Sequence, residues 1–263
     1  MFTKKNEKKM KKLALACSVF LLILSSCSSS SDSSSSSTLK LHQQIITDNS
    51  GISDTDTFTY NGNKLLRIDS SDGSYTKAYY TGNLITKFED YDDTDTLIEQ
   101  STYTYNSDNK LESYIYLDFV QDTAEKEVFT YNANGTISSS YYYGNSASAT
   151  PTDMVTTRVI TLLDGEVHTT VSTGNDDSTY TYTYDTKNNQ LKNILGYDKL
   201  AGYADGENLG IMHNIVTEAH LDANSGVTYT DNYAYTYNSS DFPLTSVVSQ
   251  LGITMETVQY IYE

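Results

Sequence analysis

The chain has 263 residues, with 17 Lys and Arg against 34 Asp and Glu, a formal net charge of −17, and 24 tyrosines but no tryptophan. So acidic a chain repels nucleic acid and anionic lipid, which excludes a nucleic-acid-binding role. The charge favours cations, basic partners or neutral ligands such as glycans, although acidity also keeps an exposed β-protein soluble. The length is sufficient to bury a sizeable core without disulfides.

The first 26 residues are typical of an export signal. Lysines between Lys4 and Lys12 form a positive region, and an apolar run from Leu13 to Leu24 follows that is too short to span a bilayer. The run ends in Leu24-Ser25-Ser26-Cys27 and resembles the lipobox of bacterial lipoproteins. The resemblance implies cleavage before Cys27 and several acyl chains on that residue, which anchor the protein to a membrane. The alternative is an ordinary secretory signal followed by a chance cysteine.

Processing leaves a tether and one domain. Residues 1–26 hold six lysines and one glutamate, so their removal leaves 11 basic and 33 acidic residues, a net charge of −22. Residues 27–38 comprise the lipidated cysteine and a serine tract that is interrupted by Asp32 and is typical of a flexible tether. The tract resembles the spacers of Bacteroidetes lipoproteins, which implies an outer-membrane location with the periplasmic or cell-surface face left open. Residues 39–263 form the folded domain.

The domain shows a β pattern almost throughout. Tyr180, Tyr182 and Tyr184 share one face of an expected strand, and Thr181 and Thr183 share the other. The same alternation recurs at Tyr233, Tyr235 and Tyr237 and at other aromatic pairs along the chain. A period of two with aromatic and β-branched residues predicts strands that bury one face.

These strands belong to an internal repeat of an aromatic strand, a turn with Asn or Gly, and an apolar strand. Asn and Gly supply the positive φ that hairpin turns need, and single hairpins must stack to bury their aromatic face. Copies stand at 58–65, 80–85, 103–111, 129–137, 182–185 and 235–238.

The repeat resembles YD-repeat sequences, whose core is Tyr-x-Tyr-Asp before a Gly-containing turn. It is more similar to uncharacterised Bacteroidetes lipoproteins with degenerate YD-like hairpins, and one such family is described as a porin-like β-barrel. The resemblance covers most of residues 55–263 and implies an architecture rather than an activity. Asn replaces Asp in most copies and the usual Gly-Arg turn is missing, so the long YD-repeat toxin cages are a poor guide to function.

We therefore expect an all-β fold. About 14 to 16 strands, counted as short alternating runs between turn residues, form an antiparallel up-and-down meander. A sheet this wide closes, or nearly closes, into a large soluble β-barrel or a strongly curved sheet. The strands alternate Tyr with Thr, Lys, Glu or Asn and lack a sustained lipid-facing row, which argues against a membrane-spanning barrel.

One stretch breaks the repeat. Residues 188–197 lead into 198–210, which is not strand-like and is expected to be a short helix or a long loop. Such an insert is a candidate lid, plug or binding loop, and the alternative is a crossover or a cap on an open barrel end.

The motifs of common enzyme sites are absent from the sequence, and no catalytic residue is predicted. His220 and Glu218 are two residues apart and share a strand face, so they form a weak candidate metal pair, whereas His213 has the opposite parity. Asp90, Asp92, Asp93 and Asp95 are oxygen-rich and form a weak candidate Ca²⁺ loop, but the Gly and distal Glu of an EF-hand are missing. No other cofactor is expected.

The composition leaves three functions open. The first is a non-enzymatic envelope lipoprotein with a structural or interaction role and a glycan or protein partner. The second is a glycan-binding lipoprotein that assists polysaccharide capture, because tyrosine rings stack on sugars. The third is a hydrolase that uses paired carboxylates, whose separation a sequence does not give.

Overall fold

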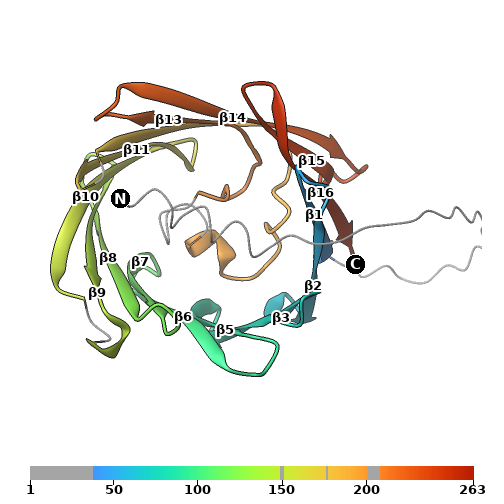
Figure 1. The fold of residues 1–263 in the computed structure, drawn as a ribbon, viewed down its shortest axis with the longest axis horizontal. Helices are drawn as coiled ribbons and strands as arrows, with labels where there is room; N and C mark the ends of the chain where they lie inside the picture. Colours follow the sequence, from blue (N-terminus) through green and yellow to red (C-terminus); the bar gives the residue numbers. More distant parts are fainter. Residues whose placement is uncertain (1–37, 149–150, 176, 201–207) are drawn as a thin grey trace, which may run out of the picture.

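The computed structural model describes residues 38–148, 151–175, 177–200 and 208–263. The signal peptide, Cys27 and the serine tether lie outside these residues, so the lipidation site stays a prediction. The described chain forms 16 antiparallel strands in one closed barrel, in which each strand pairs with its neighbours in sequence and β1 pairs with β16 (Figure 1). The predicted meander is confirmed, closed and at the upper end of the expected strand count. The strands are β1 (Leu41–Asp48), β2 (Ser53–Asn61), β3 (Lys64–Ser70), β4 (Tyr75–Thr81), β5 (Leu84–Tyr91), β6 (Leu97–Tyr105), β7 (Leu111–Asp118), β8 (Thr123–Tyr131), β9 (Ile137–Gly144), β10 (Asp153–Leu163), β11 (Glu166–Gly174), β12 (Ser178–Tyr184), β13 (Ile215–Asp222), β14 (Val227–Tyr237), β15 (Pro243–Gln250) and β16 (Ile253–Tyr262).

An up-and-down barrel has two distinct ends, because successive turns fall at opposite ends. We call one end the floor; there the chain turns at 61–64, 81–84, 105–111, 131–137, 163–166 and 237–243. We call the other end the mouth; there it turns at 48–53, 70–75, 91–97, 118–123, 144–153, 174–178, 222–227 and 250–253. Two short 3₁₀ turns, η1 (Ser146–Ser148) and η2 (Tyr197–Lys199), complete the described elements. No helix among the described residues is long and apolar enough to cross a membrane.

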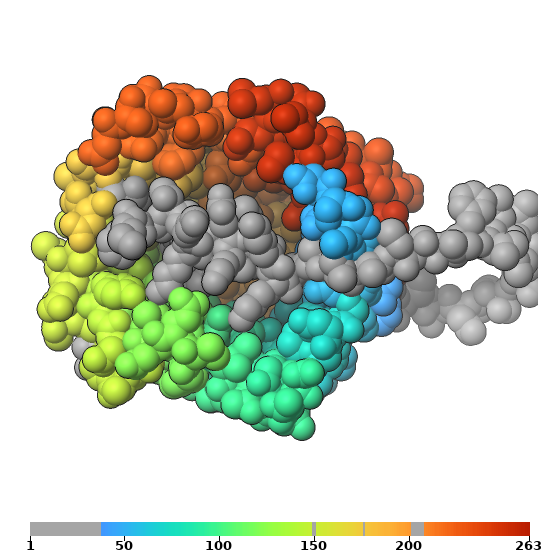
Figure 2. Space-filling model, viewed as in Figure 1, coloured from blue at the N-terminus to red at the C-terminus, as the bar shows by residue number. Residues whose placement is uncertain are grey.

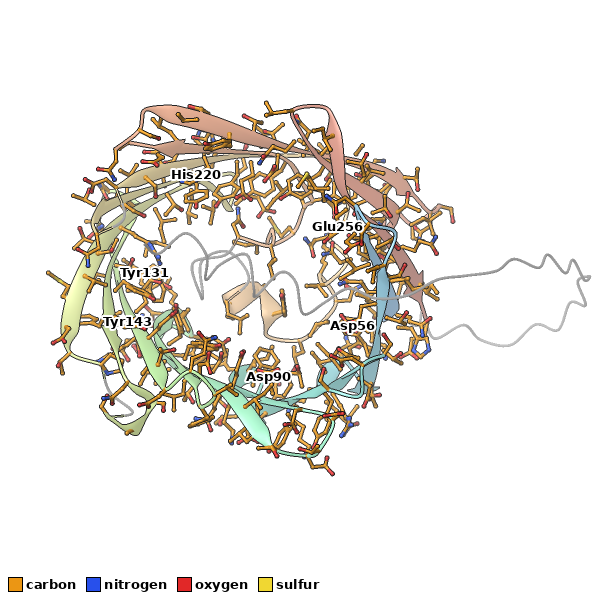
Figure 3. The ribbon with its side chains drawn as sticks, viewed as in Figure 1. Asp56, Asp90, Tyr131, Tyr143, His220 and Glu256 are labelled. Atoms are coloured by element: carbon orange, nitrogen blue, oxygen red, sulfur yellow. The ribbon has the colours of Figure 1, made fainter. Side chains whose placement is uncertain are left out.

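The tyrosines that alternate with threonines on β12 and β14 point into the lumen, whereas Tyr75, Tyr79 and Tyr91 of β4 and β5 point outward. Figure 3 shows Asp56, Asp90, Tyr131, His220 and Glu256 on the inner side of the wall. Residues that lie opposite each other across neighbouring strands share a face, so the register extends this assignment around the barrel. On β12 and β14 it places the alternating tyrosines inside and the threonines outside.

The repeat turns work as the sequence predicts. Asn106 accepts backbone hydrogen bonds from Asp108 and Lys110 in one turn, and Gly62 and Gly82 adopt φ of 61° and 60° in two others. The register also shifts by one residue beside most of these turns; at β2–β3, Tyr60 pairs with Leu65 while Thr59 pairs with Arg67. This bulge brings the tyrosine and the following aliphatic residue onto the lumen face together.

A ring of aliphatic side chains closes around the floor end. These residues begin the strands that follow the floor turns, and each is almost completely buried, which stabilises the fold by roughly 1.5–3 kcal/mol apiece. Repeat tyrosines tie neighbouring copies together, because the hydroxyls of Tyr60, Tyr105 and Tyr131 donate to backbone carbonyls about 20 residues earlier. The ring comprises Leu41, Leu65, Ile85, Leu111, Ile137, Val167 and Ile215.

Candidate functional site

The lumen is blocked at the floor by residues 185–200 and 208–214, which we call the floor segment. This segment joins β12 to β13 in place of a short turn and lies within the ring of strands (Figure 1). It reaches across the floor, since Leu195 N donates to Asn63 O at 2.8 Å and Asn188 N donates to Asp241 O at 2.9 Å. The sequence predicted that the repeat breaks at 188–197, which lead into an insert at 198–210. The described chain leaves strand geometry slightly earlier, at Asp185, and residues 201–207 lie outside the described part.

Apolar side chains hold one half of the floor segment. Ile194 and Leu200 are buried among the aliphatic ring and the floor-end tyrosines. Gly196 has a φ of 80°, and a Cβ at this position would lie 2.6 Å from the carbonyl oxygen of Asn83. Only glycine therefore allows this close approach to the β4–β5 turn.

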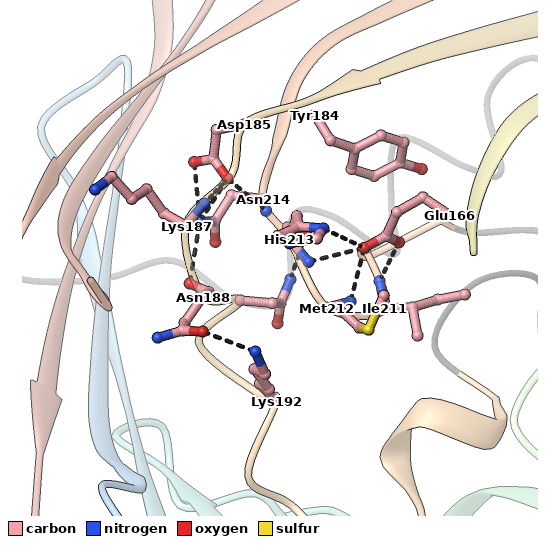
Figure 4. A network of polar contacts seen from close by, with 12 residues as sticks. Glu166, Tyr184, Asp185, Lys187, Asn188, Lys192, Ile211, Met212, His213 and Asn214 are labelled. Carbon is pink, nitrogen blue, oxygen red and sulfur yellow. Dashed lines mark hydrogen bonds and ion pairs between the residues drawn. The ribbon is translucent and has the colours of Figure 1, made fainter. Parts of the chain in front are cut away.

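A buried carboxylate holds the other half. Glu166, at the start of β11, accepts hydrogen bonds from the backbone N–H groups of Ile211, Met212 and His213, each at 2.8 Å (Figure 4). His213 Nδ1 also lies 3.2 Å from the same carboxylate. Three backbone donors on one carboxylate form a firm anchor, because hydrogen bonds to charged groups contribute about 1.5–3 kcal/mol each.

Asp185 forms a second polar anchor where β12 ends. It accepts hydrogen bonds from the Asn214 backbone and side-chain amides and from the Tyr237 hydroxyl (Figure 4). Lys187 pairs with Asp241 at 2.7 Å and connects the segment to the β14–β15 turn. The floor segment is thus tied to the wall from several strands and crosses the floor end of the barrel.

The lumen is open on one side and filled on the other. On β6 to β9, the inward side chains of Tyr103, Tyr114, Tyr116, Glu127 and Ser139 are almost completely buried. On β12 to β16, by contrast, a larger set of inward residues remains partly exposed, although Tyr182, Val258 and Tyr260 on the same face are buried. Figure 2 shows the described strands as a ring of atoms, with the orange strands β13 and β14 on its upper side. We call this accessible set the lumen wall; it comprises Tyr180, Glu218, His220, Asp231, Tyr233 and Glu256.

The lumen wall combines aromatic rings with carboxylates. The Tyr180 and His220 rings stack with centroids 4.3 Å apart. Burial raises the pKa of Tyr233, and the nearby carboxylates of Glu218, Asp231 and Glu256 raise it further. Burial also raises the pKa of Glu256. Such a surface offers ring faces, hydrogen-bond acceptors and negative charge to a ligand.

Acidic residues continue to the mouth. Asp56 faces the lumen near the β1–β2 turn (Figure 3). Burial raises the pKa of its carboxyl to about 6, although a hydrogen bond from the Ser70 hydroxyl lowers it in part. Asp54 shares its face and adds like-charge repulsion. A ligand that enters the lumen therefore passes a negatively charged rim.

One ion pair interrupts this acidic lining. Among the Lys and Arg residues of the described strands, Arg158 on β10 is the one that faces the lumen. Its Nη1 lies 2.7 Å from the carboxylate of Glu127, whose side chain is 0% exposed. Burial opposes the charge of Arg158, but the adjacent Glu127 carboxylate more than offsets it and the pKa of Arg158 rises. The Ser139 hydroxyl also donates to Glu127. The pair is internally compensated, so it leaves the net charge of the lumen negative.

Of the metal ligands predicted from the sequence, the structure places Glu218 and His220 on one face and separates the aspartates of the candidate Ca²⁺ loop. Glu218 and His220 share the lumen face of β13, as their spacing predicts, while His213 precedes the strand and contacts Glu166. Asp90 faces the lumen and accepts from Thr76, whereas Asp92 accepts backbone hydrogen bonds from Thr94 and Thr96 within its turn.

The remaining members of the candidate Ca²⁺ loop also have structural neighbours. Asp95 accepts from the Tyr75 hydroxyl at 2.8 Å, and Asp93 packs beside Gly73. In the described ranges no group of three or more His, Cys, Asp or Glu side chains is arranged to hold a metal ion. The weak metal candidates therefore stay predictions, without a converging ligand set.

Sequence reasoning missed the residues that shape the site most. Glu166, Asp185 and Arg158 were not predicted as site residues, because their partners lie 29 to 52 residues away along the chain. One local signal existed: Arg158 is a lone basic residue within an apolar β pattern, which is unusual unless it is paired.

No family model matches the chain, and no curated protein matches it. Among solved structures, it is similar to a porin-like protein from Bacteroides vulgatus ATCC 8482, with a TM-score of 0.54 and 12% identity, over 85% of this chain and 99% of that one. A porin-like protein from Bacteroides uniformis ATCC 8492 matches at 13% identity with a TM-score of 0.47, over 85% and 98% of the two chains. The first likeness shows that this chain shares the barrel fold of a porin-like Bacteroides protein.

Proposed function

We propose that this chain is a non-enzymatic binding protein of the cell envelope, in which the barrel serves as a one-ended cup. Lipid on Cys27 would hold the cup at the outer membrane, and ligand would enter through the mouth and rest against the lumen wall. This proposal assigns the lumen wall as the binding site for the non-enzymatic interaction role expected from the sequence.

The floor segment is the observation that carries this proposal. Its polar anchors at Glu166 and Asp185, together with buried Ile194 and Leu200, close one end of the barrel. A barrel closed at one end holds a ligand rather than conducting it. The half-exposed rings and carboxylates of β12 to β16 provide the surface against which a ligand can rest.

The outer face supports a cup that stands in water. Threonines occupy outward positions on β2, β12 and β14, and Arg67, Lys77, Lys87 and Glu89 occupy those of β3 to β5. Lys87 pairs with Glu89 at 2.5 Å, and Lys77 lies over the Tyr75 and Tyr91 rings. Such charges are costly against lipid, so a tether suits this barrel better than insertion.

Thiol labelling tests the cup. With Cys17 and Cys27, the chain's two cysteines, replaced by serine, Tyr233→Cys on the lumen face should react with a small maleimide and resist a bulky polymer maleimide. Asn232→Cys, its outward neighbour, should react with both. Equal reaction of Tyr233→Cys with both reagents would contradict an enclosed site.

Glycan capture is the second candidate, and the partly exposed Tyr180, Tyr229 and Tyr233 rings favour it. An oligosaccharide that occupies the lumen should protect Tyr233→Cys from the small maleimide and leave Asn232→Cys reactive. Protection of neither position by a panel of neutral oligosaccharides would count against this candidate.

A further inference from the structure

We infer that the cup selects organic cations, with an amine or guanidinium group of the ligand seated between Tyr233 and Glu256. This inference rests on the proposed function, because it names the ligand class of the same lumen wall.

The first step is the separation of charge across the barrel wall. On the described strands, Lys and Arg side chains other than Arg158 point outward or, in the case of Lys64, lie at a floor turn. Inward positions on β8, β13, β14 and β16 instead carry carboxylates, and the compensated Arg158–Glu127 pair lies on the filled side of the lumen. The potential in the open half is therefore negative, which attracts cations and repels anions.

The second step is an aromatic surface that suits a cation. On the lumen face, Tyr233 lies on β14 with Asp231, one strand from Glu218 and two strands from Glu256. Burial raises the pKa of the Tyr233 hydroxyl, and these three carboxylates raise it further. A cation over a tyrosine ring gains from the ring quadrupole, and more so when partly removed from water. The outer face already uses this contact, since Arg67 lies 3.6 Å and Lys87 lies 4.1 Å from the centroids of their tyrosine rings.

The third step is a carboxylate that lacks a counterpart. Glu256 is partly buried on β16 and faces the lumen (Figure 3), yet no hydrogen bond or ion pair joins its carboxylate to another group within the described residues. Burying a charge without a partner costs free energy. A ligand cation would supply that partner, whereas a neutral sugar would compensate it less and an anion would worsen it.

Calorimetry on the full-length protein in neutral detergent tests the inference, with the linear triamine spermidine as the probe. We expect saturable binding that Glu256→Gln weakens about tenfold or more, because the variant keeps the size of the side chain and removes its charge. Tyr233→Leu should weaken binding, while Tyr233→Phe should retain it. Glu112→Gln, at an exposed outward carboxylate, is the matched control and should change nothing.

The outcomes separate this inference from the cup itself. If maltoheptaose protects Tyr233→Cys and spermidine does not bind, the cup stands and the cation preference is overturned. The inference also fails if Glu256→Gln and Glu112→Gln weaken spermidine equally, or if Mg²⁺ at equal ionic strength displaces it fully, since these results indicate general counter-ion binding. Equal labelling of Tyr233→Cys by small and bulky reagents would overturn the proposed function as well.

Discussion

Asp56 shows how an acidic lumen disfavours the charged form of a single carboxyl group. Burial raises the pKa of its carboxyl to about 6, the nearby carboxylates of Asp54 and Asp72 add to this, and the Ser70 hydroxyl works against it. A carboxyl whose pKa rises on folding stabilises the fold while it is protonated. That contribution is fully present below about pH 4 and is lost as the pH rises through 6.

The first prediction therefore concerns Asp56→Asn. The amide keeps an acceptor for Ser70 and removes the buried charge, so the free energy of unfolding should rise by up to about 2–3 kcal/mol at pH 8 and remain unchanged at pH 3. Urea unfolding at the two pH values measures the difference. Glu112→Gln, at an exposed position, is the control and should show no such dependence. An equal effect of Asp56→Asn at both pH values would contradict the titration argument.

The second prediction concerns the ion pair within the wall. Glu127→Gln leaves Arg158 buried without a full counter-charge and should lower the free energy of unfolding by about 3–5 kcal/mol. Glu127→Gln combined with Arg158→Met should recover much of this loss, because the unpaired charge is gone. Denaturant unfolding of the wild type, both single variants and the double variant completes the cycle. Additive single effects would show that the two side chains do not interact.

At the scale of elements, the hairpins are determined by residues close together in the sequence, whereas the floor segment depends on residues far apart. Alternation and Asn/Gly turns lie within a few residues, so the sequence predicts the meander and the lumen-facing tyrosines. The bulges beside the turns and the anchors Glu166 and Asp185 depend on partners from other strands, and closure depends on contact between β1 and β16. The sequence therefore predicted an insert that is a candidate plug, lid or cap, but missed the residues that hold it.

The third prediction tests the floor segment as an element. Gly196→Ala would combine a φ of 80° with a Cβ 2.6 Å from Asn83 O, so the segment should detach from the β4–β5 turn while the barrel stays folded. Hydrogen exchange should increase in residues 189–200 and remain slow in β1 and β16. Gly62→Ala is the matched control, because its φ of 61° is equally left-handed but nothing lies within 4 Å of the added Cβ. Similar exchange in the two variants would show that backbone strain alone, rather than the close approach, governs the segment.

At the scale of the whole molecule, charge is sorted by surface. The lumen and mouth carry uncompensated acid, while the basic residues of the strands other than Arg158 lie on the outer face or at the floor turns, often over tyrosine rings. In the proposed location, an electronegative cup would draw cationic solutes to its opening and repel anionic surfaces. The predicted serine tether would then set how far the opening stands from lipid.

The fourth prediction concerns that tether. Cys27→Ser should prevent acylation, so the protein should move from the membrane fraction to the soluble fraction with its barrel intact, because the barrel lies beyond residue 38. Fractionation, with mass spectrometry of the N-terminal peptide, measures the change. Ser29→Cys in the same background is the control and should not restore anchoring. Membrane retention of Cys27→Ser without acyl mass would overturn the lipoprotein assignment.

The seam between β1 and β16 has a consequence for how the domain is made. Lys40 and Glu263 exchange two backbone hydrogen bonds, so the residue before β1 is paired with the residue after β16. Until β16 emerges during synthesis, β1 presents an unpaired edge, and a product that ends before β16 keeps two such edges open to strand exchange. Chains shortened before β16 should therefore aggregate more readily than chains in which the ring can close.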